Sequence, residues 1–220
     1  MIRQFKLGVR LMRYAFGIKL CAGFAILFFL LGILLSFIPA RYGVMSSGGG
    51  LFLIMPGMWL LQLLFSLVSA GMVQASPWNR SLQTSIQILV GFVGFAASYV
   101  VIILLKLPLL PGASEEMRQS IVAELLLDAL LAVVVMIYFG TANKFFVTST
   151  VVFVVLFLGL TSVYAILLFP AASRLSFGAA AAIGGAFLIV GAFLQYGLSV
   201  LVYKYPPSKK AQLRSLQKYM

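Results

Sequence analysis

Long apolar stretches separated by short polar segments follow one another along almost the whole chain. Most of these stretches hold about twenty residues, the length that a helix needs to cross the hydrocarbon core of a bilayer. The pattern predicts an all-α fold, namely a polytopic membrane bundle of six transmembrane helices. The predicted spans cover residues 18–39, 51–73, 86–110, 121–139, 145–169 and 177–203.

Residues 1–17 carry an amphipathic pattern instead of a uniformly apolar one. Apolar residues recur at helical spacing on one stripe, and a neighbouring stripe holds the cations Arg3, Lys6, Arg10 and Arg13. A helix of this kind lies in the membrane interface, with its cations at the lipid head groups. Two interpretations remain open: a topology anchor, or an elbow helix against which a partner subunit or the moving bundle pushes.

Composition agrees with a membrane location. Hydrophobic residues make up 63% of the 220 residues and charged residues 9%, whereas soluble domains are about a quarter charged. The formal net charge of +12 does not indicate a nucleic-acid protein, because the cations flank apolar spans and no solvated basic face with aromatic readers is present. We expect membrane lipid as a partner and no nucleic acid.

The distribution of Lys and Arg predicts the orientation. With the N-terminus inside, 12 of the 16 cations fall on inner segments. Cytoplasmic segments carry such an excess, so we expect a multi-pass protein of the plasma membrane with both termini cytoplasmic. The chain then divides into the interfacial helix at 1–17, the six-span domain at 18–203 and a basic cytoplasmic tail at 204–220. The outer cations are Arg41, Lys106, Arg118 and Arg174.

The chain lacks the residue types of most catalytic and metal sites. It has no His, the usual general base and a common metal ligand. Its single cysteine, Cys21, lies in an apolar stretch, where inert packing is expected. No lysine is followed by Ser or Thr, so the phosphate-binding pattern G-x-x-x-x-G-K-[ST] does not occur. We expect no catalytic, cofactor-binding or metal site and no enzyme activity; a process driven by ATP would need its ATP hydrolysed on another chain.

All four carboxylates fall between Glu115 and Asp128. Glu124 and Asp128 are spaced i,i+4 inside the fourth span, hence on one helical face. A charge at the centre of a span costs roughly 2.5–3.5 kcal/mol, so it usually faces a partner or a cavity. Lys106 and Arg118 are the candidate partners. A structural ion pair, a polar lining of a translocation path and a proton relay remain open, although the relay is disfavoured because the inner half of the membrane holds no acid.

A second polar segment follows the second span. Ser76 is expected to cap a short helix with Pro77 at its first position, and Trp78 and Leu82 then lie on one face of that helix. Two interpretations are open: a docking knob for a partner, or a tryptophan anchored at the membrane interface. The residues of this predicted coupling loop are Ser76, Pro77, Trp78, Asn79, Arg80 and Leu82.

Small residues form two faces on the sixth predicted span. Gly178, Ala182 and Ala186 lie on one face, and Gly184 and Gly191 lie on another. Small side chains let helices approach closely in lipid. Both faces are therefore predicted to pack within the bundle, with a dimer interface as the second interpretation.

The run 75–85, Ala-Ser-Pro-Trp-Asn-Arg-Ser-Leu-Gln-Thr-Ser, resembles the coupling segment between the second and third spans of ABC transporter permeases of the ABC-two class. Such permeases serve Gram-positive exporters of peptides and bacteriocins, including the exporters of phenol-soluble modulins. The resemblance implies an elbow helix, six spans and cytoplasmic termini. It also implies a permease dimer, with a second copy or a close paralogue, and a cytoplasmic ATP-binding subunit that holds ATP and Mg²⁺ and grips the loop helix. Many relatives have re-entrant outer helices before the last span; residues 170–176 are too short for them, so a simpler outer gate is expected.

These features predict the permease subunit of an ATP-driven exporter that moves an amphipathic peptide or another hydrophobic substrate out of the cell. Its path is expected to be largely apolar, because the spans offer few hydrogen-bonding side chains. One alternative is the substrate-binding membrane component of a vitamin importer, which would bind a small molecule tightly by itself. Another is a non-transporting immunity or scaffold protein, which would act without any ATPase.

Overall fold

The computed structural model describes residues 2–15, 17–36, 49–69, 71–74, 76–163, 170 and 174–205. All regular secondary structure in this part of the chain is helical. The elements are α1 (Ile2–Met12), α2 (Ile18–Ser36), α3 (Gly49–Val68), α4 (Gly71–Gln74), α5 (Asn79–Gln83), α6 (Ser85–Lys106), the 3₁₀ helix η1 (Leu107–Leu109), α7 (Glu115–Ala142), α8 (Phe146–Val163) and α10 (Phe177–Tyr203).

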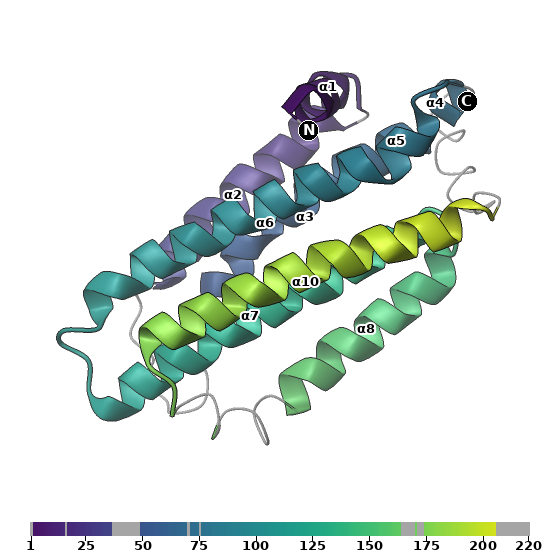
Figure 1. Ribbon diagram of the computed structural model, residues 1–220. Coiled ribbons are helices and arrows are strands. Elements are labelled where there is room, and N and C mark those ends of the chain that lie inside the picture. Colours follow the sequence, from purple (N-terminus) through teal and green to yellow (C-terminus); the bar gives the residue numbers. More distant parts are fainter. Residues whose placement is uncertain are drawn as a thin grey trace.

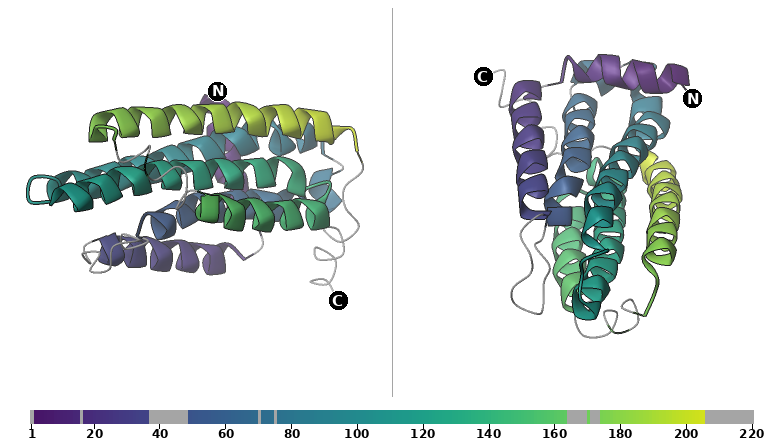
Figure 2. Two further views of the ribbon diagram at one scale, coloured as in Figure 1. Left: turned by 90° about the horizontal axis from the view of Figure 1, so that it is seen from below. Right: turned by 90° about the vertical axis from the view of Figure 1, so that its left-hand side faces the viewer.

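The long helices lie side by side in one bundle (Figure 1). Helix α7 is its centre and packs against α3, α8 and α10, while α2 packs mainly against α3. Helix α1 lies across one end of the bundle, nearly at right angles to the long helices (Figure 2, right). The short helices α4 and α5 lie at this same end, which we call the α1 end.

Five of these helical segments are long and apolar enough to cross a membrane. They are α2, α3, the stretch Asn79–Leu109 that contains α6, α7 and α10. The fifth predicted span corresponds to α8. The described helix is shorter than the other five, and residues 164–169 of the predicted range lie outside the described residues. The all-α fold predicted from the sequence is therefore confirmed for the described residues, and five of their helices could span a membrane.

Several predicted boundaries were wrong by a turn or more. Helix α3 ends at Val68, and the predicted extension to residue 73 is interrupted at Ser69 before α4 begins. Helix α7 begins at Glu115, six residues before the predicted span, because the Ser114 hydroxyl accepts a hydrogen bond from the Met117 amide at 3.3 Å. Such a side-chain cap satisfies one of the free amides of a first turn. The mainly polar residues 115–120 therefore extend the helix.

Helix α1 packs on the bundle through a face that includes Gly8. A Cβ at Gly8 would lie 2.5 Å from the Cγ2 atom of Ile86 on α6, so the two helices are in close contact. Leu7 and Leu11 also pack against the hydrophobic core. Val9, on the predicted apolar stripe, is instead 40% exposed. The amphipathic helix is thus attached to the bundle by protein contacts.

The two small-residue faces of α10 differ in the structure. Gly184 lies against Tyr99 of α6 and Ala129 of α7, and Gly191 lies against Met136 of α7. This face packs within the bundle, as predicted. The prediction was wrong for Gly178, Ala182 and Ala186, which are all exposed because the contacts of α10 with α6 and α7 use the other side of the helix.

Candidate functional site

The Lys106 ammonium and the Glu124 carboxylate form a buried ion pair between α6 and α7. Lys106 is the last residue of α6, and Glu124 lies in the first half of α7. Their side chains are only 5% and 11% exposed. The predicted structural ion pair is therefore present for Glu124. The other candidate partner, Arg118, instead directs its Nη2 atom to the carbonyl of Leu110 at 3.5 Å.

Asp128 lies one helical turn beyond Glu124 and is 3% exposed. Its Oδ2 atom is buried without a hydrogen-bond partner. Gly50 of α3 faces this carboxyl group, and any side chain at position 50 would overlap it. The cluster thus combines one cation with two carboxyl groups, and only one of the two takes part in the ion pair. The path-lining and relay interpretations of Glu124 and Asp128 stay predictions.

Asp128→Asn is expected to leave the thermal stability within about 1 kcal/mol of the parent or to raise it. The amide keeps the shape of the side chain and removes the second carboxyl group from a site that holds one cation. Thermal unfolding in detergent, followed by circular dichroism, measures the effect. Asp128→Leu is the comparison variant, which changes shape as well as charge. If Asp128→Asn lost as much thermal stability as Asp128→Leu, the interpretation that the second carboxyl group does not stabilise the cluster would be contradicted.

Neutral polar residues form a second buried cluster nearer the α1 end, and the sequence analysis missed it. The Nε2 group of Gln87 donates to the carbonyl of Phe139 at 2.8 Å, and its Oε1 atom accepts from Asn143 at 3.3 Å. Gln195 on α10 is wholly buried, and neither atom of its amide has a partner. Amides inside apolar spans usually face the bundle interior, which is the signal that could have found them.

The predicted coupling loop forms a projection at the α1 end. Trp78 is 51% exposed, and Arg80 is exposed beside it. Asn79 accepts a hydrogen bond from Gln83 at 2.6 Å through its side-chain oxygen, and its Nδ2 group donates to the carbonyl of Gln74 at 3.1 Å. The exposed side chains are therefore carried by a segment with well-satisfied hydrogen bonds.

Two details predicted for this loop were wrong. Helix α5 begins at Asn79 with Trp78 at its N-cap, so Ser76 and Pro77 precede it; the Ser76 hydroxyl donates to the carbonyl of Val73 at 2.9 Å instead of capping α5. Leu82 is 1% exposed and belongs to the hydrophobic core. Trp78 and Leu82 therefore do not share an exposed face, since Trp78 precedes the helix and points to the surface.

The basic stripe of α1 keeps its predicted exposure where its side chains are described. Lys6, Arg10 and Arg13 are exposed, and Arg13 lies in the turn just after α1 ends. Arg3 belongs to α1, but its side chain lies outside the description. The stripe faces away from the bundle contact at Gly8, so it is free to meet head groups or a partner.

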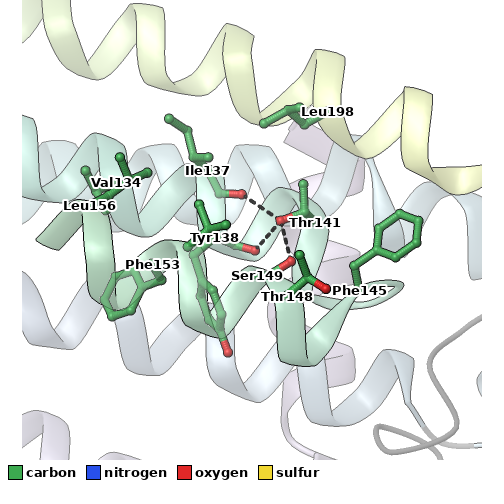
Figure 3. A pocket seen from close by; sticks show the side chains of 11 residues that line it. Val134, Ile137, Tyr138, Thr141, Phe145, Thr148, Ser149, Phe153, Leu156 and Leu198 are labelled. Atoms are coloured by element: carbon green, nitrogen blue, oxygen red, sulfur yellow. Dashed lines mark hydrogen bonds between the residues drawn. The ribbon is translucent and has the colours of Figure 1, made fainter.

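A cavity of about 250 Å³ opens between α7, α8 and α10 (Figure 3). Its walls are mainly apolar and include Val134, Phe153 and Leu198. Its polar part includes a hydroxyl pair, in which Ser149 donates to the Oγ1 atom of Thr141 at 2.8 Å, together with the hydroxyl-bearing residues Tyr138 and Thr148. A larger groove of about 470 Å³ lies between α6 and α10 and is also mainly apolar.

No family model, curated protein or solved structure matches this chain. The described residues contain no group of three His, Cys, Asp or Glu side chains that could hold a metal ion. The helices themselves indicate a class, because five of them are long and apolar enough for a multi-pass membrane protein.

Proposed function

We propose that the chain is the permease subunit of an ATP-driven exporter. In this proposal the bundle has six spans, with α8 as the fifth, and α1 is an elbow helix at the cytoplasmic interface. Both termini are cytoplasmic, and the permease pairs with a second copy or a close paralogue. A separate ABC subunit binds ATP and Mg²⁺ and contacts the coupling loop.

The observation that carries the proposal is the exposed Trp78 at the start of α5. A tryptophan with an adjacent arginine is a typical anchor of a protein interface. The exposed end of this loop is fixed to the bundle, because Leu82 and Gln83 of the same short helix are buried. A partner that pushes on Trp78 would therefore move α6, which follows α5 directly, instead of deforming a loose loop.

Charge supports the proposed orientation. The described cations at the α1 end include Lys19, Arg80, Lys144 and Lys204, together with the basic stripe of α1. Cytoplasmic segments carry such an excess of Lys and Arg. The mainly apolar groove between α6 and α10 supports an amphipathic or hydrophobic substrate, since its exposed members Phe193 and Ile189 could face a second copy across the path.

Replacing Trp78 with Ala and Arg80 with Gln together is expected to lower the recovery of an ABC ATPase with the full chain by about tenfold. The reason is the loss of the exposed aromatic and cationic contacts without a change in the core. The measurement is co-purification of candidate ATP-binding subunits co-expressed with the chain, followed by substrate-stimulated ATP hydrolysis.

Tyr14→Ala is the matched control, because Tyr14 is an aromatic residue at the α1 end that is 80% exposed but lies outside α5. It should leave the ATPase bound. Equal losses from both variants would favour interfacial anchoring and contradict the docking role. Unchanged association of the ATPase with the variant that lacks Trp78 and Arg80 would also contradict the docking role. Leu82 is unsuitable for this test, since its truncation would create a cavity in the core.

A further inference from the structure

The cavity between α7, α8 and α10 has the dimensions and the chemistry of a site for a hydrocarbon chain. From Thr148 to Leu156, two of its lining residues, α8 rises by about 12 Å. One leaflet supplies about half of a hydrocarbon core of roughly 30 Å. The hydroxyl of Thr141 is occupied by Ser149 and by the carbonyls of its own helix. The walls thus offer little hydrogen bonding and suit an apolar occupant.

Cations gather where this cavity meets the α1 end. The Nζ atom of Lys144 lies 5.4 Å from the centre of the Tyr203 ring, and the Cζ atom of Arg80 lies 5.8 Å from the same centre. Phe145, which lines the cavity, packs against Tyr205 with the ring centres 5.3 Å apart and the rings tilted by 59°. The ring of Tyr203 thus contacts two like charges, and one of them, Lys144, directly precedes the cavity-lining Phe145.

The chain supplies no side-chain carboxylate to balance these cations. All four carboxylates lie between Glu115 and Asp128, and Asp128 is about 21 Å from the end of α7 at Ala142 along the helix axis. Partial burial also lowers the pKa of the Lys144 ammonium, because desolvation disfavours its charged form. An anion from outside the chain would offset both this cost and the repulsion between Lys144 and Arg80.

We propose that this cavity binds one anionic phospholipid, with an acyl chain between α7 and α8 and its phosphate beside Lys144 and Arg80. Basic pockets between membrane helices bind anionic head groups in this way. The apolar cavity selects a lipid over a free phosphate, and the two cations select an anionic over a zwitterionic head group. The site joins α5, α7, α8 and α10, so the lipid would hold α8, which otherwise packs mainly on α7, to the rest of the bundle. The proposal does not depend on the exporter function.

The test measures lipid binding to the purified full chain by native mass spectrometry, with dioleoyl phosphatidylglycerol and dioleoyl phosphatidylcholine as probes. We expect one phosphatidylglycerol to be retained per chain under conditions that remove phosphatidylcholine. Each cation near a membrane surface contributes roughly fivefold to the affinity for anionic lipid, so Lys144→Gln with Arg80→Gln should weaken retention by about 25-fold. Val152→Trp, which fills the cavity from the lipid-facing side of α8, should weaken retention of the same lipid without any change in charge.

The matched control is Arg13→Gln with Lys19→Gln, which removes two exposed cations from the α1 end away from the cavity. Retention should then fall by less than about twofold. An equal fall in the control and the site variant would overturn the proposal, because it would indicate general attraction to the basic surface. Equal retention of the two lipids, or unchanged retention in the Val152→Trp variant, would overturn it as well. Circular dichroism melting of each variant verifies the fold.

Discussion

Lys106→Met is expected to lower the free energy of unfolding by about 3–5 kcal/mol. The substitution keeps the unbranched shape of the side chain up to the position of the ammonium but leaves the carboxylate of Glu124 buried without its cation, beside the second carboxyl group of Asp128. Removing one partner of a buried pair costs more than the pair itself contributes, because the remaining charge stays desolvated. Reversible unfolding of the chain in mixed micelles measures the loss.

The double variant Lys106→Met with Glu124→Met separates this mechanism from a simple loss of packing. With both partners apolar, most of the lost stability should return, since replacement of a whole buried pair by apolar groups is often neutral. Lys204→Met is the matched control at an exposed position and should change the stability by less than about 0.5 kcal/mol. A double variant as unstable as Lys106→Met would contradict the ion-pair interpretation.

The sequence predicted the helical class and one partner, because both depend on short-range or compositional rules. The last span was predicted to begin at residue 177, and α10 does begin at Phe177, where the Ser176 hydroxyl accepts a hydrogen bond from the Ala179 amide at 3.2 Å. Lys106 was one of two candidate partners for the acids of the fourth span, and it does pair with Glu124. Adjacent spans joined by a short loop bring their outer ends together. Five long apolar helices follow directly from the lengths of the apolar runs.

Other features depend on packing between distant segments and could not be read from the local pattern. Leu82 was assigned to a surface because its neighbours are polar, yet the core between α3 and α6 covers it. The pairing of Gln87 with Asn143 joins residues 56 positions apart and has no local signature. The cavity between α7 and α8 exists because these two apolar helices move apart at one place. The lengths of the apolar stretches in the sequence do not indicate where that place is. The exporter function and the membrane orientation remain predictions.

Gly184 and Gly185 provide a direct test of how the bundle packs. A Cβ at Gly184 would overlap the hydroxyl of Tyr99 and lie 3.2 Å from the Cβ of Ala129, whereas a Cβ at Gly185 would meet no atom within 4 Å. Tyr99 is 5% exposed, and its hydroxyl donates to the carbonyl of Ala180 at 3.4 Å. The ring therefore has little room to move away. Two neighbouring glycines of one helix thus differ only in what faces them.

Gly184→Ala is expected to destabilise the chain by about 1–3 kcal/mol, because α10 must move away from α6 or Tyr99 must leave its position. Gly185→Ala should be neutral or stabilising by about 0.5–1 kcal/mol, since alanine favours a helix over glycine and fits the open space. Unfolding in mixed micelles compares the two variants with the parent. Combining Gly184→Ala with Tyr99→Phe, which removes the overlapping hydroxyl, should recover part of the loss. Equal effects of the two alanines would mean that α10 does not pack on α6 and α7 through the Gly184 face.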